Sequence, residues 1–488
     1  MLSNSLRQFI LLLCRQIKGG LVCFVNFVPS HRIAMIKIFS SSINRLVMLL
    51  CTATLLLTNG TVFGQKEWAL QECVNYALQH NLNVKQSYLN TNQAANQVLH
   101  NKLALAPTVS GSAGSSYNWG RSVDPFTYQF TNEEIRSVNL SLNGNASLFN
   151  GFELQNTLRQ SKLDYLASQS DLKKIENDIS LNVVSEYLQV LFAKEQLKIY
   201  DNRVAESGKQ RDRTKIMYDA GNMTRGNLLD AESQLATEEL NKITAENQFT
   251  TATLNLVQLL ELDSTKDFQV QEPKVDISSI EILSQSSEGI YQKAIAHLPE
   301  IQSVDLKVNS AEKGLSIAKG GLYPRLSMYG SYSSGSSSAA QNLLGKPTPF
   351  KDQLNNNLAR SLGLSLNVPI FSGWSAHTSI NRAKITVLNA QLNADITRNQ
   401  VFKSIQQAYT DAVSAQKKYY ATQKSEEALQ EANLYADKRF NAGLSSSLEF
   451  LTATNNLTKA KTELLQAKYD YIFKLKILDF YAGNPLTF

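Results

Sequence analysis

Residue types that could carry out catalysis or bind a metal occur throughout the sequence, but their spacing does not form a known catalytic arrangement. A phosphate-binding loop, a serine-hydrolase turn, a zinc-protease helix and a Cys-x-x-Cys pair each require a fixed motif, and the chain contains none of them. We therefore predict that the protein is not an enzyme and that it holds no cofactor and no metal.

The histidines and carboxylates support this prediction. His80 and His297 stand beside Asn-Leu and Leu-Pro pairs at matching places in two halves of the chain, which favours a structural turn over a metal site. The other histidines after residue 64, His100 and His377, are isolated. Most Asp and Glu residues lie on predicted helices opposite apolar residues, where we expect solvated faces.

The first 64 residues have the layout of a secretory leader. Met35-Ile36-Lys37 begins a short basic region, residues 46–57 are almost wholly apolar, and small residues precede Gln65. The apolar run is short for a helix that spans a bilayer. We expect cleavage near Gly64 and a true start at Met35, and an unusually long leader is the second interpretation.

Removing this leader changes the inferences from charge and cysteine content. The formal net charge of the whole chain is +6, and residues 1–64 hold six Lys and Arg side chains and no Asp or Glu. The remainder is therefore close to neutral, which argues against nucleic acid as a partner. Cys73 is the only cysteine after residue 64, so an internal disulfide is excluded and a small buried apolar role is expected.

The rest of the chain is an internal duplication. The segment Phe149-Asn150-Gly151-Phe152 returns as Phe371-Ser372-Gly373-Trp374, and Tyr218-Asp219-Ala220-Gly221 returns as Phe440-Asn441-Ala442-Gly443. A period of roughly 220 residues is far longer than the ~20–50 residues of solenoid repeats. We therefore predict two copies of one large unit, residues 65–285 and residues 286–488.

Each copy is predicted to contain a long helical hairpin. Residues 126–272 and 370–484 contain no proline, and apolar residues recur there at helical spacing. About 70 residues separate Gly151 from Gly221, and the same number separates Gly373 from Gly443, which as helix would reach about 100 Å. Glycine is the usual stop signal beyond a helix end, so each far glycine should mark an antiparallel return.

Each copy should also contribute two strands. Residues 138–148 and 362–370 alternate clearly between apolar and Ser, Asn or Gly side chains, and residues 109–119 and 326–332 do so more weakly. The connecting loops contain Asp124-Pro125-Phe126 and residues 333–357. An outer wall in lipid and an inner wall in water explain this alternation better than a soluble sandwich. Four strands cannot close a barrel, so several chains must contribute.

In this order and twice over, these features resemble the TolC-type outer-membrane efflux protein family. The resemblance spans nearly the whole chain after the leader and includes the opening segment 68–82, Pro107 and Pro324 before the strands, and the glycine turns already quoted. It implies a mainly α fold with a transmembrane β-barrel portion and long coiled-coil hairpins in a periplasmic tunnel. Three chains with four strands each would close one barrel in the outer membrane, and residues 263–285 would fall at the midpoint of the tunnel.

The resemblance also implies roles for particular residues. The hairpin tips would form the periplasmic entrance and contact the adaptor protein of an inner-membrane transporter. By position, the adaptor-contacting residues would be Tyr218, Gly221, Phe440, Gly443 and Leu444. The strand-to-helix turns would be formed by Phe149, Gly151, Phe371 and Gly373.

The family often places carboxylates just after the hairpin turns, as a constricting ring. Glu449 matches such a position in the second copy, whereas Asn227 stands at the equivalent position in the first copy. Asp230, three residues further on, is a possible substitute. Rings of carboxylates favour cations, so this departure bears on the charge of the entrance.

Three functions are compatible with this sequence. The first is an exit duct for small toxic compounds, and the second is the duct of a type I system that exports polypeptides. A periplasmic coiled-coil adaptor is a third, which the paired amphipathic strands disfavour.

Overall fold

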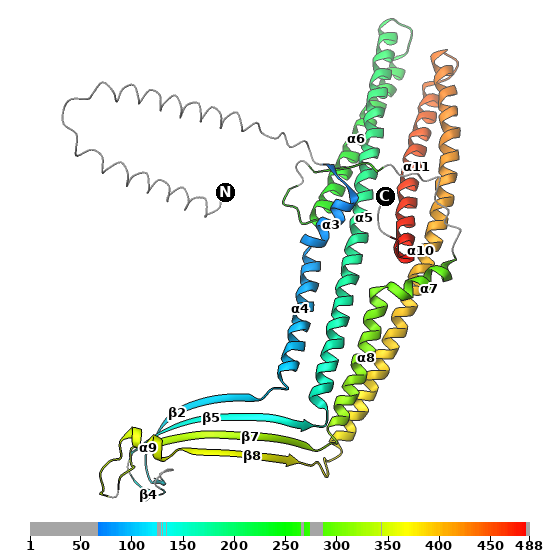
Figure 1. Ribbon diagram of the computed structural model, residues 1–488. Helices are drawn as coiled ribbons and strands as arrows, with labels where there is room; N and C mark the ends of the chain where they lie inside the picture. Colours follow the sequence, from blue (N-terminus) through cyan, green and yellow to red (C-terminus); the bar gives the residue numbers. More distant parts are fainter. Residues whose placement is uncertain are drawn as a thin grey trace, which may run out of the picture. The chain divides into compact units, whose positions relative to one another are not determined.

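The described part of the chain forms a long bundle of helices with a β-sheet at one end (Figure 1). The structure is a computed structural model that describes residues 67–123, 128, 130–132, 134–264, 268–273, 286–342 and 344–484. The expected leader, the loop segment Asp124-Pro125-Phe126 and most of the segment 263–285 lie outside these residues. Among the residues that are described, no helix is both long and apolar enough to cross a membrane.

Each half of the chain begins with a pair of shorter helices of matched length. Helix α3 (Leu70–His80) and helix α7 (Ser287–His297) have 11 residues each, and α4 (Leu82–Leu103) and α8 (Pro299–Gly320) have 22 each. His80 and His297 occupy the last turns of α3 and α7, where each imidazole Nδ1 lies within 3.0 Å of a backbone carbonyl of the preceding turn. Both histidines therefore occupy a helix end.

Two much longer helices run through almost the whole bundle. Helices α5 (Glu153–Asp219) and α10 (Ser375–Asn441) have 67 residues each. At about 1.5 Å per residue, each is roughly 100 Å long. Each turns back into a shorter antiparallel partner, α6 (Arg225–Leu259) or α11 (Ser447–Ala482), so the structure contains both helical hairpins.

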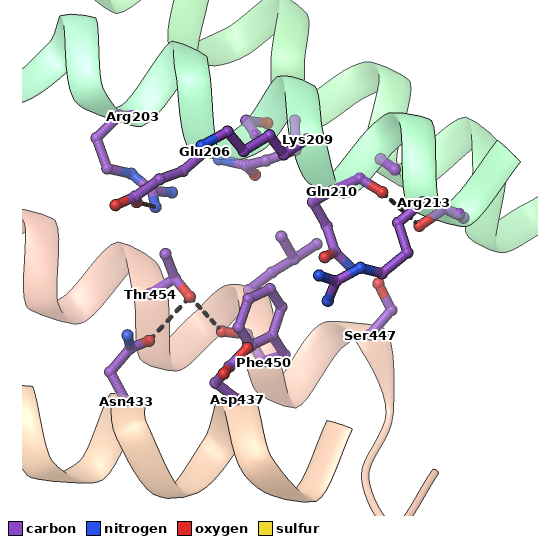
Figure 2. A pocket seen from close by; sticks show the side chains of 15 residues that line it. Arg203, Glu206, Lys209, Gln210, Arg213, Asn433, Asp437, Ser447, Phe450 and Thr454 are labelled. Carbon is purple, nitrogen blue, oxygen red and sulfur yellow. Dashed lines mark hydrogen bonds and ion pairs between the residues drawn. The ribbon is translucent and has the colours of Figure 1, made fainter. Parts of the chain in front are cut away.

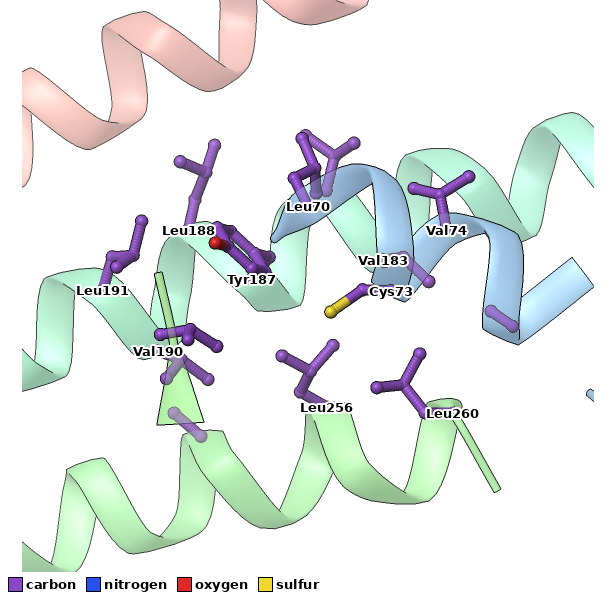
Figure 3. Close-up of a cluster of buried hydrophobic side chains, with 14 of the residues drawn as sticks. Leu70, Cys73, Val74, Val183, Tyr187, Leu188, Val190, Leu191, Leu256 and Leu260 are labelled. Carbon is purple, nitrogen blue, oxygen red and sulfur yellow. The ribbon is translucent and has the colours of Figure 1, made fainter. Parts of the chain in front are cut away.

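The helices bury two apolar clusters near the middle of the bundle. In the first, α3 packs against α5 and α6, and Cys73, which is 0% exposed, lies among Leu70, Val183 and Leu256 (Figure 3). Tyr187 lies in the same cluster and its hydroxyl donates to the carbonyls of Trp68 and Gln271. Burial raises the pKa of this phenol, so it stays protonated and fixes the adjoining chain segments. The second cluster joins α7, α10 and α11.

The sheet is antiparallel and its strands follow the order β2-β5-β7-β8. The bounds are β2 (Thr108–Asn118), β5 (Ile135–Asn150), β7 (Arg325–Ser337) and β8 (Ala359–Asn367). Strand β8 is shorter than the predicted 362–370 at its carboxyl end, because Pro369 cannot donate a ladder hydrogen bond.

The two faces of the sheet differ in polarity. Directly paired residues share a face, and the pairs Leu326–Leu366 and Met328–Leu364 place large apolar side chains together. The pairs Ser112–Ser141 and Ser331–Ser361 lie on the other face, where their hydroxyls are hydrogen bonded across the strands. The predicted alternation of apolar and polar faces is therefore present.

Several short elements were not predicted. Strand β1 (Glu67–Trp68) pairs in parallel with β6 (Gln269–Val270), and β3 (Ser122–Val123) pairs with β4 (Phe130–Thr131). The expected loop 333–357 is wrong at both ends: β7 extends to Ser337, and residues 350–356 form helix α9 (Phe350–Asn356). Helix α9 is too short to produce a clear period in the sequence.

Candidate channel entrance at the hairpin tips

The two hairpin tips have the same backbone construction. We define the first tip as residues 217–227 and the second tip as residues 439–449. Gly221 and Gly443 have φ of +77° and +72°, a conformation that favours glycine. Each following residue donates its backbone N–H to a carbonyl five residues back, at 2.8 Å in both tips, which closes the helix end as a Schellman motif.

The returning helices also start in the same way. The hydroxyl of Thr224 accepts from the backbone N–H of Asn227 at 3.3 Å, and the hydroxyl of Ser446 accepts from that of Glu449 at 3.2 Å. Such N-caps fix the direction in which a helix leaves a turn. Asn227 and Glu449 therefore occupy equivalent places in the first turns of α6 and α11.

The side chains of the tips are different. In the second tip, Arg439 donates to the carboxylate of Glu449 at 2.7 Å and to the carbonyl of Leu444 at 3.4 Å. In the first tip, the equivalent positions of the ion pair are Met217 and Asn227. Both residues of the ion pair are therefore replaced by uncharged residues in the first tip, and this ion pair spans the turn only in the second tip. Asp230 lies about one turn further along α6, on an exposed position.

The predicted adaptor-contacting residues lie at these ends of the hairpins. Leu444 is 70% exposed, and Phe440 stacks on Phe450 with ring centroids 5.1 Å apart. Ile216 near the end of α5 and Leu448 near the start of α11 were not predicted as site residues, and they are 70% and 75% exposed. Exposed apolar side chains at the end of a helical hairpin are suited to contact with another protein.

A cleft of about 300 Å³ separates the two hairpins just behind the tips (Figure 2). On its α5 side, the guanidinium of Arg203 lies 2.9 Å from the carboxylate of Glu238, and these side chains are only 11% and 3% exposed. Gln234 donates to the same carboxylate at 2.8 Å. Carboxylates were predicted to lie on solvated faces, and Glu238 is an exception because Arg203 reaches it from the facing helix.

Direct hydrogen bonds cross between the hairpins beside this cleft. Arg213 on α5 donates to the side-chain oxygen of Asn441 on α10 at 3.0 Å. Gln234 on α6 donates to Asn455 on α11 at 3.4 Å. Further toward the middle, Tyr469 donates to Glu195, and burial together with that carboxylate raises the pKa of the phenol.

The strand-to-helix turns also use left-handed backbone. Gly151 and Phe152 have φ of +67° and +62°, and Gly373 and Trp374 have φ of +59° and +67°. Phe149 packs edge-on against Phe152, whereas Phe371 is 81% exposed. Gly151 is buried against the end of α8, where a Cβ atom would lie 2.4 Å from the carbonyl oxygen of Gly320. A Cβ atom at Gly373 would have no atom of the described residues within 4 Å, apart from the glycine itself and its two chain neighbours.

Metal binding finds no support in the part of the chain that the structure describes. No group of three or more His, Cys, Asp or Glu side chains there is placed to hold an ion. The tips present charged, amide and apolar side chains at one end of a long helical assembly.

The outer membrane efflux protein family matches this chain over residues 73–261 and 290–484. Outer membrane efflux protein BepC of Brucella suis is 24% identical over 429 residues, which cover 87% of each chain. Outer membrane protein TolC of Vibrio cholerae is 24% identical over 65% of this chain and 68% of its own. Alkaline protease secretion protein AprF of Pseudomonas aeruginosa is 22% identical over 75% of each.

Solved structures share the fold. CusC superimposes with a TM-score of 0.73 at 17% identity, covering 87% of this chain and 96% of its own. The Campylobacter jejuni CmeC outer membrane channel gives 0.73 at 20% identity, covering 85% of each. Members of this family are outer-membrane channels and transport proteins. The chain belongs to the outer membrane efflux protein family and is an outer-membrane channel with a periplasmic helical portion.

Proposed function

We propose that three copies of this chain form one exit duct, which passively conducts small toxic compounds from an inner-membrane transporter and its periplasmic adaptor to the exterior. The observation that carries the proposal concerns the described residues: the sheet ends in two strands that have no outer partner, and the row of helices beside it ends in two helices that have none. A heterologous contact between such edges generates a closed ring if the rotation closes.

The sheet supplies the first pair of edges. Strands β2 and β8 are the outermost strands of the four and have no further strand partner within the described chain. Open edges are aggregation-prone, and closure into a barrel removes them. Pairing of β8 with β2 of the next copy would yield twelve strands from three chains, with the apolar face toward lipid.

The helices supply the second pair. Next to the sheet they stand in the row α4-α5-α8-α10, so α4 and α10 are the outer helices (Figure 1). Each carries leucines and isoleucines at heptad-like spacing that are more than half exposed: Leu82, Leu89, Leu99 and Leu103 on α4, and Ile385, Leu388, Leu392 and Ile396 on α10. Apolar seams of this kind normally pack against another helix. Neighbouring copies would bury them against each other.

The internal repeat predicts the register of the sheet contact. Within the chain, Asn143 of β5 pairs with Ser331 of β7. The equivalent residues on the outer strands are Ser365 of β8 and Gly114 of β2. If the ring repeats the internal contact, Ser365 faces Gly114 of the next copy.

Cysteine cross-linking tests this assembly. The double variant Ser365→Cys/Gly114→Cys should give a disulfide-linked trimer on oxidation in outer membranes, and each single variant should give none. The double variant Ser365→Cys/Ser116→Cys is the matched control, because its second thiol is displaced by two residues on the same face. A linked dimer alone, or equal linking in the control, would contradict the proposed ring.

Channel activity is tested separately. Purified protein in a planar bilayer should give discrete conductance, low while the entrance is closed, and fractionation should place the protein with detergent-requiring membrane proteins. A well-folded protein without conductance, or a soluble periplasmic monomer, would contradict the duct and favour a coiled-coil adaptor.

Export of a polypeptide is the second candidate function, since one relative is named an alkaline protease secretion protein. The same duct would serve both cargoes. Deleting the gene should sensitise cells to small toxic compounds if the first proposal holds, whereas loss of a secreted protein with unchanged drug tolerance would favour the second.

We further propose that the tips form the entrance. Tyr218, Gly221, Phe440, Gly443 and Leu444 would contact the adaptor. Glu449, with Asn227 and Asp230 on the other hairpin, would set the charge of the opening.

A further inference from the structure

The end of the sheet farthest from the long helices contains a second cleft, of about 820 Å³. Its floor is the apolar face of the sheet, with Ala113 of β2 and Val138 of β5. Its wall is the segment that leads into α9, with Pro347 and Phe350, and Phe350 is 53% exposed. Arg136 of β5 is the charged side chain among the lining residues. The size falls within the ~300–1,000 Å³ typical of small-molecule sites.

Hydrogen bonds hold the wall in place. The side chain of Gln353, which is 7% exposed, accepts from the backbone N–H of Ser337 at 2.8 Å and donates to the carbonyl of Thr348 at 2.7 Å. Asn357 donates to the carbonyl of Gly335 at 2.8 Å. The loop is therefore fastened to β7, and the cleft exists before any ligand arrives.

Arg136 lies on the apolar face and not on the polar one. It pairs directly with Tyr117 and shares its side of β5 with Val138, Leu140 and Leu142. Its guanidinium carbon lies 5.6 Å from the centre of the Tyr117 ring, a cation–π contact that orients the charge. Within the described part of the chain, no carboxylate forms an ion pair with Arg136. On the lipid-facing surface of a barrel, an arginine is destabilising at the bilayer midplane and tolerated near the interface, where water and anionic groups can reach it.

The position along the strand decides which anion can reach it. Arg136 lies 13 residues before Phe149, at the end of β5 away from the helices. At about 3.3 Å per residue and a tilt of about 40°, this corresponds to roughly 33 Å along the membrane normal. The apolar band of an outer-membrane barrel is about 25 Å tall, so a band that begins at Phe149 would end before it reaches Arg136.

All sides of this cleft come from one chain. Strand β5 is flanked by β2 and β7 of the same copy, so closing a ring through β2 and β8 would leave the floor unchanged. The site combines an apolar floor, an aromatic wall and one oriented arginine at the level of the outer headgroups. These features match an amphipathic molecule with acyl chains and a phosphate group.

We infer that this cleft binds the phosphorylated glycolipid of the outer leaflet, with a lipid A phosphate on Arg136 and acyl chain against Val138 and Phe350. The inference rests on the outer-membrane location of the family and is independent of the cargo and of the entrance. A phospholipid carries similar chemistry, but the outer leaflet of this membrane is built mainly of the glycolipid.

Native mass spectrometry of the purified full-length protein, titrated with lipid A, tests the inference. Charge-assisted hydrogen bonds contribute about 1.5–3 kcal/mol, so Arg136→Gln should weaken binding about tenfold or more. Dephosphorylated lipid A should bind the unmodified protein as weakly as lipid A binds this variant. Phe350→Ala should also weaken binding, by removing the wall.

Arg360→Gln is the matched control. Arg360 also lies on the apolar face and stacks on a tyrosine, Tyr332, at 5.5 Å, but it does not line the cleft, so its replacement should leave lipid A binding within about twofold. Circular dichroism checks folding, and Phe350→Ala carries the test if Arg136→Gln is unfolded.

Unchanged lipid A binding in Arg136→Gln or in Phe350→Ala would overturn the site. Equal loss in Arg360→Gln would indicate a general charge effect and would also overturn it. Phosphatidylglycerol binding as tightly as lipid A would overturn the choice of the glycolipid. Because binding is measured in detergent without transport, each of these failures would leave the duct proposal standing.

Discussion

The two hairpins share one backbone but differ in where their charges lie. Both have a 67-residue helix, a left-handed glycine at the turn and a hydroxyl N-cap on the returning helix. The first hairpin has an ion pair between its helices, Arg203–Glu238, whose side chains are only 11% and 3% exposed. The second hairpin has Ser425 and Ala460 at the equivalent positions, and it carries at its tip an ion pair, Arg439–Glu449, that the first tip does not share.

This difference distinguishes the features that specify the hairpin fold from those that change its local stability. Glycine, caps and apolar seams recur in both halves, so they are sufficient for a hairpin of this length. The ion pairs do not recur, so neither is needed for the hairpin as such. Buried pairs resist salt and are costly to break, whereas exposed pairs are weak and screened. We therefore expect the helices of the first hairpin to be rigid behind the tip, and the ion pair at the tip of the second hairpin to break and re-form readily.

The largest expected effect comes from breaking the buried pair. Glu238→Ala removes the buried carboxylate and leaves Arg203 with only the exposed carboxylate of Glu206, 3.2 Å away, which should destabilise the first hairpin by about 1.5–3 kcal/mol. Hydrogen exchange of peptides from α5 and α6, with chemical denaturation of the purified protein, measures this. The double variant Arg203→Met/Glu238→Leu should recover most of the loss, because no charge then remains buried.

The second hairpin provides the control for this prediction. Ser425→Ala, at the position equivalent to Arg203, should change the free energy of unfolding by no more than about 0.5 kcal/mol. If Glu238→Ala had an effect as small as Ser425→Ala, the contrast between a stiff and a reversible hairpin would be wrong.

The strand-to-helix turns give the next largest effect. Gly151→Ala places a Cβ atom 2.4 Å from the carbonyl oxygen of Gly320, so α8 or the turn must shift. The Cβ atom of Gly373→Ala has no neighbouring atom within 4 Å among the described residues. Its expected destabilisation comes only from placing alanine at a φ of +59°, which costs about 1 kcal/mol. In denaturation of the detergent-solubilised monomer, the equilibrium constant of unfolding should be several-fold larger for Gly151→Ala than for Gly373→Ala.

The same pair of variants sharpens the comparison when measured in the assembled protein. If neighbouring copies repeat the internal contact, the end of α4 of the next copy closes on Gly373, as α8 closes on Gly151. Gly373→Ala should then reduce the yield of assembled trimer while barely affecting the monomer. An unchanged trimer yield would mean that the contact between copies does not repeat the one inside the chain.

The features that sequence could predict are those set by local pattern. Helix length, the glycine turns and the alternation of the strands depend on residues that are close in the chain, and the predicted hairpins agree with the structure within a few residues. Helix α9 was missed because seven residues give no period, and the pairing of β1 with β6 was missed because it joins segments about 200 residues apart.

The polar contacts were harder to predict for a related reason. Arg203 and Glu238 are 35 residues apart and meet only because α6 folds back at a given register along α5. Arg439 and Glu449 lie across a turn, where the separation of ten residues corresponds to no helical or strand period. The position of Glu449 was visible in the repeat, but its partner was not.

Breaking the ion pair between Arg439 and Glu449 should have a smaller effect, mainly on the opening of the proposed entrance. Glu449→Gln removes a carboxylate from the proposed opening and releases Arg439, so conductance should rise or block by divalent cations should weaken. An exposed pair contributes about 0.2–1 kcal/mol, so the change in the closed-to-open equilibrium should stay below about fivefold. Planar-bilayer recording with and without Mg²⁺ measures both quantities.

Transplanting the pair is the matched control at the other tip. Met217→Arg/Asn227→Glu should give the first tip the ion pair of the second and strengthen the divalent block. If neither Glu449→Gln nor this transplant alters conductance or block, Glu449 has no part in the gate, and the difference between the tips does not concern passage.

The smallest expected effect is the pH dependence of a pair that also belongs to the second hairpin alone. Lys474 on α11 donates to Asp411 on α10 at 2.9 Å, and this hydrogen bond lowers the pKa of the carboxyl. The equivalent residues of the first hairpin are Gln189 and Ala252. A lowered pKa means that the pair stabilises the hairpin above about pH 4, the ordinary pKa range of Asp, and that this contribution is lost as the pH falls through the folded-state value. We therefore expect the free energy of unfolding of Asp411→Asn to be lower than that of the unmodified protein by no more than about 1 kcal/mol at pH 6, and this difference to disappear as the pH falls to 2. Chemical denaturation of both proteins across this pH range measures the difference. A difference that stays constant with pH would assign the stabilisation to packing rather than to charge.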